Sequence, residues 1–153
     1  MRTGETIPRF ELEDEDGVSF SSNNLKGAPS VIYFYPKDDT PGCTAEACSF
    51  RDQFEDFTQL GARVIGISND DSASHRRFKE KHRLPFTLLS DPNGNVKKAF
   101  GVKGNLFGLL SGRVTFIFNE KCELVHQFDS QINVLKHVKE ALSILKHNHS
   151  PSK

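Results

Sequence analysis

The chain has 153 residues, the size of one ordinary domain, and can bury about 70% of the surface that its unfolded form would expose. Twenty basic and twenty acidic residues cancel, so no broad electrostatic field favours nucleic acid or a membrane surface, and we expect neither as a partner. Three cysteines, an odd number in a chain that needs no crosslinks, indicate a reducing compartment and thiols kept for chemistry.

The N-terminal residues 1–17 lack the apolar core of a signal peptide and become acidic within a few residues, unlike a transit peptide. No segment approaches the length of a membrane span. We therefore expect a cytoplasmic protein, although the mature form of an organellar protein would have the same features.

The first predicted element is a β-hairpin. Phe10 and Leu12 alternate with polar residues before the turn sequence at 14–17, and Val18 and Phe20 alternate after it.

A buried central strand is predicted next, at residues 31–35, because VIYFY is a continuous β-prone run that Pro36 ends. A helix is predicted from Cys43 to Leu60, and its apolar residues recur three or four positions apart at Ala47, Phe50, Phe54 and Phe57. Residues 63–67 are predicted to form the following buried strand.

The second half continues the alternation of helices and strands. We expect a helix at 72–83, a strand at 86–89, a turn at 91–94, strands at 114–118 and 124–128, and a terminal helix carried by Ile132, Leu135, Val138, Leu142 and Leu145. The tail from about residue 147 to 153 is expected to be disordered.

This order of elements predicts one α/β domain spanning 1–153, with helices on both faces of a mixed sheet. Reactive groups in such sheets lie beyond the carboxyl ends of the strands. Cys43 and Cys48 occupy that place, because they follow the strand at 31–35 in the first turns of the next helix.

The start of this helix favours a thiolate. Thr40 is a good N-cap residue and Pro41 suits the first helical position, which places Cys43 about three residues into the helix. Its sulfur would lie near unpaired backbone N–H groups and the positive end of the helix dipole. Gly42 leaves room beside the sulfur for a small substrate.

Ionisation alone is too weak to explain catalysis. A free thiol with a pKa of about 8.5 is only about 3% thiolate at pH 7, so complete ionisation gains roughly thirtyfold, whereas enzymes commonly reach about a millionfold. Most of the acceleration must come from donors aimed at charge that develops on the substrate. The Thr40 hydroxyl, the Cys43 N–H and a distant arginine are candidates.

These residues carry a resemblance to a known family. The pattern Pro36-x-x-x-Thr40-x-x-Cys43 resembles the active-site signature of the peroxiredoxins, and the string TPGCTAEACSFRD resembles that of the peroxiredoxin Q, or bacterioferritin comigratory protein, subfamily. The segments at 4–12 and 113–116 are also similar, so the resemblance spans nearly the whole chain.

The resemblance implies a thioredoxin-like fold and the reduction of hydrogen peroxide and organic hydroperoxides. Cys43 would be the peroxidatic cysteine and Cys48 the resolving one, and the two would form an intramolecular disulfide. Thr40 and Arg113 would orient and polarise the peroxide, and Pro36 would shield the sulfenic acid. A monomer recycled by thioredoxin or a glutaredoxin-type donor is expected, without metal or other cofactor.

Several residues have simpler interpretations. Cys122 follows a turn without a motif, so we expect a buried apolar residue, and the five-residue cysteine gap argues against a zinc site. Arg51 and Asp52 could form pairs on the helix surface or help to hold the helix of Cys43, and we prefer the structural role; Leu106 and Phe107 are candidates for the pocket mouth.

Two other functions stay open at this point. One is a thiol-disulfide oxidoreductase without peroxidase activity, against which the missing C-x-x-C motif and the Thr40–Cys43 pair count. The other is a non-catalytic redox sensor or interaction protein.

Overall fold

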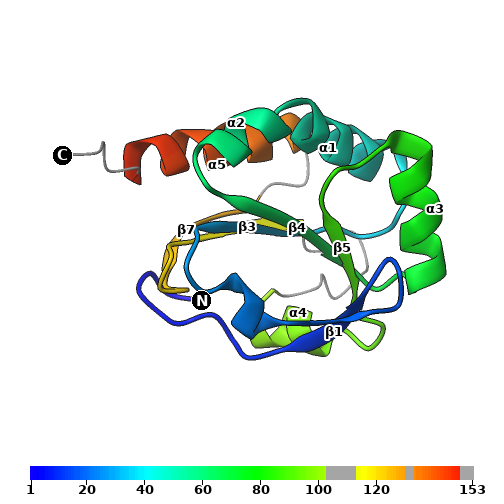
Figure 1. Cartoon of the computed structure of the whole chain (residues 1–153), viewed down its shortest axis with the longest axis horizontal. Coiled ribbons are helices and arrows are strands. Elements are labelled where there is room, and N and C mark those ends of the chain that lie inside the picture. Colours follow the sequence, from blue (N-terminus) through cyan, green and yellow to red (C-terminus); the bar gives the residue numbers. More distant parts are fainter. Residues whose placement is uncertain (103–112, 130–132, 149–153) are drawn as a thin grey trace.

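Seven strands form one mixed sheet through the middle of the protein (Figure 1), of which the computed structural model describes residues 1–102, 113–129 and 133–148. The strands are β1 Glu11–Asp14, β2 Ser19–Ser21, β3 Ser30–Phe34, β4 Arg63–Ser68, β5 Thr87–Ser90, β6 Val114–Phe118 and β7 Leu124–Asp129, in the spatial order β2-β1-β5-β4-β3-β6-β7. Strands β3, β4 and β5 are parallel, and the other pairings are antiparallel. The predicted mixed sheet and N-terminal hairpin are confirmed.

Strand β3 is the buried central strand that its sequence predicts. All five of its residues are buried, because β4 and β6 flank it and helices cover its faces. Its side chains alternate between two apolar cores, with Val31 and Tyr33 in one and Ile32 and Phe34 in the other. This double burial is why the strand is a continuous apolar run.

Helices cover both faces of the sheet (Figure 1). They are η1 Ser22–Leu25, α1 Pro41–Asp52, α2 Phe54–Gln59, α3 Ser72–His82, α4 Asn95–Ala99 and α5 Val134–Asn148. Helices α1, α2 and α5 lie on one face, and α4 lies on the other, where Phe100 packs against Phe34 and Phe116. Within the described residues, no helix is long and apolar enough to cross a membrane.

The predicted helix from Cys43 to Leu60 is two helices, because the backbone departs from helical geometry at Gln53 (φ −101°, ψ 8°). Phe50 and Phe57 are nevertheless both fully buried, so the break preserves the apolar stripe that the spacing revealed. Helix α4 was not predicted, since its five residues are too few for a periodic pattern.

The terminal helix is confirmed, with one error in its predicted apolar face. Leu135 is 55% exposed, whereas the polar His137 is fully buried and faces the sheet. Helix α5 extends to Asn148, so residues 147 and 148 are helical rather than part of a disordered tail. Ile132 and residues 149–153 lie outside the described residues.

Candidate active site

The loop between β3 and α1 brings Thr40 to the N-cap of α1, with Pro41 in the first turn. The Thr40 side chain makes no capping hydrogen bond, because its hydroxyl donates to the Lys37 carbonyl at 2.9 Å. The sequence suggested this hydroxyl as a donor to substrate. Its hydrogen is donated to the Lys37 carbonyl, so the Thr40 oxygen is available only as an acceptor.

Cys43 lies in the first turn of α1, as predicted, and only 1% of its surface is exposed. The first N–H groups of a helix have no partner within the helix and carry the positive end of its dipole. Because Thr40 does not cap them with its side chain, these groups are available to negative charge near the sulfur.

Arg113 is the distant arginine that the chemistry required, and strand register brings it to the thiol. Phe34 pairs with Val114 at the end of the antiparallel β3–β6 ladder, so Arg113 enters the site beside the loop that follows β3. Its Nη2 donates to Cys43 Sγ at 3.4 Å, and the residue is 4% exposed. Burial opposes the charge on Arg113, but Glu46 and Cys43 outweigh it and raise the pKa of Arg113.

Gly42 provides space for the guanidinium. A Cβ at this position would lie 3.1 Å from Arg113 Nη2, which is closer than most side chains tolerate. The sequence suggested that Gly42 admits a substrate to the sulfur. In the structure, the Arg113 guanidinium lies against the space that a side chain at position 42 would occupy.

Glu46 is the site residue that sequence analysis missed. Its carboxylate accepts from Arg113 Nη1 at 2.6 Å, and the residue is fully buried. Burial raises the pKa of Glu46 to about 7, although the Arg113 charge and hydrogen bond act in the opposite direction. A glutamate three residues after Cys43, on the buried face of a helix, was the available signal.

A buried histidine lies behind this pair. His137 of α5 is fully buried, and its Nδ1 lies 2.7 Å from the Thr115 hydroxyl and 3.7 Å from Glu46 Oε2. The network therefore runs from α5 through Glu46 and Arg113 to the Cys43 sulfur. Within it, Arg113 donates from Nη1 to Glu46 and from Nη2 to the thiol, so the Glu46 contact fixes the direction of the guanidinium.

The three cysteines have different surroundings. Cys48 is half-buried in the same helix as Cys43. Cys122 is buried in the turn after β6, near the end of β3 that lies opposite the Cys43 loop, and burial raises its pKa. The three thiols therefore cannot share a metal ion, which agrees with the expectation from their spacing.

Arg51 holds α1 against α3. Its Nη1 donates to the carbonyl of His82 at 2.8 Å, and its Nε pairs with Asp52 at 3.0 Å on the surface. The structural role expected from the sequence is confirmed. Pro36 is half-buried in the loop that follows β3, whereas Leu106 and Phe107 lie outside the described residues.

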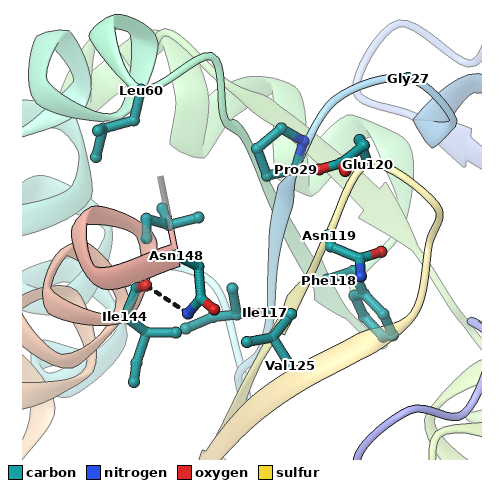
Figure 2. A pocket seen from close by; sticks show the side chains of 11 residues that line it. Gly27, Pro29, Leu60, Ile117, Phe118, Asn119, Glu120, Val125, Ile144 and Asn148 are labelled. Atoms are coloured by element: carbon teal, nitrogen blue, oxygen red, sulfur yellow. Dashed lines mark hydrogen bonds between the residues drawn. The ribbon is translucent and has the colours of Figure 1, made fainter. Parts of the chain in front are cut away.

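A cavity of about 360 Å³ lies at the other end of the sheet (Figure 2). Its lining includes Pro29 and Asn119, which flank the paired residues Ser30 and Phe118. Cys43 follows the opposite end of β3, so this cavity is separate from the thiol site.

Comparisons with known proteins agree with this geometry. Residues 3–127 match the AhpC/TSA family. Peroxiredoxin Q from rice (Oryza sativa subsp. japonica), named as chloroplastic, is 49% identical over 142 residues, which are 93% of this chain and 65% of the rice protein. The chain thus spans about two thirds of that relative's length.

Two solved structures resemble the whole chain. Peroxidoxin BcpB from Mycobacterium tuberculosis superimposes with a TM-score of 0.90 at 37% identity, covering 98% of this chain and 99% of the other. The bacterioferritin comigratory protein of Xanthomonas campestris, studied for its alkyl peroxide reduction activity, has a TM-score of 0.85 at 32% identity, with 92% of each chain covered. The expected thioredoxin-like peroxiredoxin fold is confirmed.

Proposed function

Because the chain belongs to the peroxiredoxins of the AhpC/TSA family, in the peroxiredoxin Q group, we propose that it is a thiol-dependent peroxidase acting on hydrogen peroxide and organic hydroperoxides. The observation that carries the proposal is the Arg113 guanidinium, 3.4 Å from the Cys43 sulfur at the start of α1. This arrangement places fixed positive charge where a thiolate attacks and an oxyanion leaves.

In the first step, the Cys43 thiolate attacks one oxygen of the hydroperoxide. A sulfur–oxygen bond forms, the oxygen–oxygen bond breaks, and an alkoxide or hydroxide leaves and takes up a proton, so that the sulfur becomes a sulfenic acid. The developing negative charge is stabilised by Arg113 and the uncapped N–H groups of the first turn of α1.

Two polar groups are suited to orient the peroxide. Within the described residues, Arg113 Nε is buried and has no hydrogen-bond acceptor, so it is a donor left for substrate. The Thr40 oxygen can accept a hydrogen bond from the peroxide, since the Thr40 hydroxyl donates its own hydrogen to the Lys37 carbonyl. Pro36, half-buried beside this loop, would keep water from the sulfenic acid.

In the second step, the Cys48 thiol attacks the sulfenic sulfur, which forms the Cys43–Cys48 disulfide and releases water. Five residues in an ideal helix separate two Cα atoms by roughly 8 to 9 Å, beyond the limit of about 7 Å for a disulfide. Both cysteines belong to the continuous helix α1, so its first turns must unwind for the bond to form.

A dithiol protein of the thioredoxin or glutaredoxin type would then reduce the disulfide, and we propose that the enzyme works as a monomer. We also keep the cytoplasm as its proposed compartment, although the rice relative is named as chloroplastic. Sedimentation of the reduced protein and fractionation of its source cells test these two statements.

The deciding experiment is peroxide consumption by the reduced protein with a dithiol donor. We expect Cys43→Ser to remove essentially all turnover, because the Cys43 sulfur is the one that accepts a hydrogen bond from the Arg113 guanidinium at the start of α1. The matched control is Cys122→Ser, which should keep nearly wild-type turnover. Equal losses in both variants would refute the assignment.

The same variants separate the alternative functions. A thiol-disulfide oxidoreductase would reduce a disulfide substrate at a rate that does not depend on peroxide. A sensor would be oxidised once and would not turn over with the donor. Sustained peroxide consumption that requires Cys43 contradicts both.

A further inference from the structure

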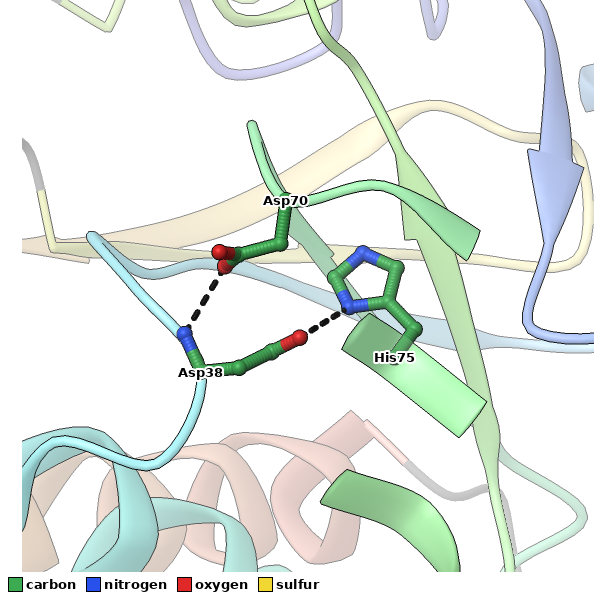
Figure 3. A group of neighbouring side chains, drawn as sticks. All are labelled: Asp38, Asp70 and His75. Atoms are coloured by element: carbon green, nitrogen blue, oxygen red, sulfur yellow. Dashed lines mark hydrogen bonds and ion pairs between the residues drawn. The ribbon is translucent and has the colours of Figure 1, made fainter. Parts of the chain in front are cut away.

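A buried aspartate–histidine pair anchors the loop between β3 and α1 (Figure 3). Asp38 lies in this loop, two residues before Thr40, and its Oδ2 is 2.7 Å from Nδ1 of His75 on α3. The two side chains are 3% and 0% exposed. No reaction step described above uses His75, although it is connected to the loop that holds Thr40.

His75 links the loop to the sheet through its two ring nitrogens. Its Nε2 lies 2.9 Å from the carbonyl oxygen of Leu89, which only accepts, so Nε2 carries a hydrogen. Its Nδ1 faces Asp38, whose carboxylate also accepts from the Tyr35 hydroxyl at 2.6 Å and the Ser74 hydroxyl at 2.9 Å. Three side chains, Tyr35, Ser74 and His75, therefore hold the Asp38 carboxylate, and His75 also contacts the sheet through Leu89.

The main chain of the loop is fixed at the same point. The backbone N–H of Asp38 donates to Asp70 Oδ2 at 2.8 Å, and the same oxygen accepts from Ser68 at 2.7 Å. Asp38, Asp70 and His75 are close enough to suggest a cation site. Their facing atoms already have protein hydrogen-bond partners, however, so the cluster fits a hydrogen-bonded anchor better than a metal centre.

We propose that His75 is a positioning residue for the peroxidase reaction, acting through Asp38 to hold the Thr40 oxygen in the geometry that orients the hydroperoxide. This inference rests on the proposed peroxidase function. His75 itself is held in position by two regular elements, because it belongs to α3 and its ring bonds to Leu89 in β5. It therefore transmits their position to a loop that has no regular structure of its own.

Only Asp39 separates Asp38 from Thr40, so a shift of Asp38 should displace Thr40 as well. Asp39 between them has a positive φ of 60°, which a non-glycine residue rarely adopts, and Thr40 is bonded back to Lys37. A loop held in such a conformation relaxes when its anchor is removed. Arg113 donates to Cys43 and Glu46, which both belong to α1, so this arrangement should persist when the loop relaxes.

Two substitutions separate positioning from simple support of the fold. In His75→Asn, the amide nitrogen falls near the place of Nδ1, so the bond to Asp38 is kept and the bond to Leu89 is lost. In His75→Gln, the amide nitrogen falls near the place of Nε2, with the opposite result. Each variant loses one buried hydrogen bond, and comparable losses of thermal stability are expected.

The measurement is the second-order rate constant for oxidation of reduced Cys43 by hydrogen peroxide, together with the melting temperature of each variant. We expect His75→Gln to slow oxidation by about tenfold to a hundredfold, as for a misplaced orienting group, and His75→Asn to stay within about threefold of wild type. Arg76→Ala, an exposed neighbour on α3, is the control and should match wild type.

A milder variant keeps the test decisive if a His75 variant does not fold. Ser74→Ala removes one donor from Asp38 on a half-buried turn of α3, and we expect a smaller loss of rate with little change in melting temperature. Two outcomes would overturn the inference while the wild type remained an active peroxidase. One is a wild-type oxidation rate in both His75→Gln and Ser74→Ala. The other is a loss of rate that tracks the loss of stability equally in His75→Gln and His75→Asn. Absence of peroxide turnover in the wild type would overturn the proposed function as well.

Discussion

The buried carboxyl group of Glu46 should make the stability of the protein depend on pH in a way that a single substitution reveals. Burial raises the pKa of Glu46 from 4.5 to about 7 despite the adjoining Arg113. At about 1.4 kcal/mol per pH unit, this rise corresponds to a loss of roughly 3 kcal/mol of folding free energy when the carboxyl ionises. Glu46→Gln keeps a side chain of the same shape and cannot ionise.

The sign follows from which state binds the proton more tightly. Below pH 4.5, the carboxyl group is protonated in both the folded and the unfolded chain, and the full contribution of the neutral group is present. Between 4.5 and about 7, the folded state keeps a proton that the unfolded state has released, so stability falls as pH rises. Above this window the difference from the glutamine variant should be constant.

Urea unfolding of reduced wild type and Glu46→Gln at pH 5, 6, 7 and 8 measures the effect. The wild type should lose about 2 to 3 kcal/mol relative to the variant across this series, because other titrating groups largely cancel in the difference. Glu80→Gln, at an exposed glutamate of α3, is the control substitution. Repeating the series in a Cys43→Ser background removes the thiol that shares Arg113 with Glu46. A difference that does not change with pH would show that Arg113 keeps Glu46 ionised and would refute the reasoning.

Three further predictions concern the site. Arg113→Ala should slow Cys43 oxidation by about a hundredfold or more. Arg113→Lys should recover only part of the lost rate, because an ammonium lacks the planar fork that contacts both Glu46 and Cys43. Unchanged stopped-flow kinetics of the alanine variant would place the residue outside the reaction. Gly42→Ala should preserve thermal stability but slow oxidation, since its Cβ would press on Arg113 Nη2 from 3.1 Å, and equal rates for the two proteins would contradict this. Cys48→Ser should be oxidised once by peroxide and then become prone to overoxidation, which mass spectrometry detects. In the oxidised wild type, protection of backbone amides from hydrogen exchange should fall around residues 43–48, while β3 stays protected. If the oxidised form kept full protection there and had no Cys43–Cys48 disulfide, another thiol would resolve the sulfenic acid.

Local sequence determined the parts of this protein that depend on neighbouring residues. The continuous apolar run of β3 predicted a central strand, and Thr40, Pro41 and Cys43 predicted a helix that begins at the thiol. These features could be predicted from the sequence, because a strand buried on both faces and the start of a helix each require particular residue types within a few positions. The same patterns located Cys43 at the carboxyl end of a strand without any knowledge of the remaining chain.

Contacts between distant segments were decided only by the tertiary structure. The resemblance named Arg113, but only the pairing of Phe34 with Val114 explains how it reaches the sulfur. Sequence analysis singled out neither Glu46 nor Asp38, because their burial and their contacts with Arg113 and His75 depend on segments far away in the chain.

The break at Gln53 and the exposure of Leu135 have the same origin. Hydrophobic spacing reveals that a helix has an apolar side, whereas packing against the other elements determines which residues occupy it. Charge and hydrogen bonding act through space over a few ångströms, so the partners of a buried polar side chain are set by how strands and helices meet, and sequence separation carries little information about them.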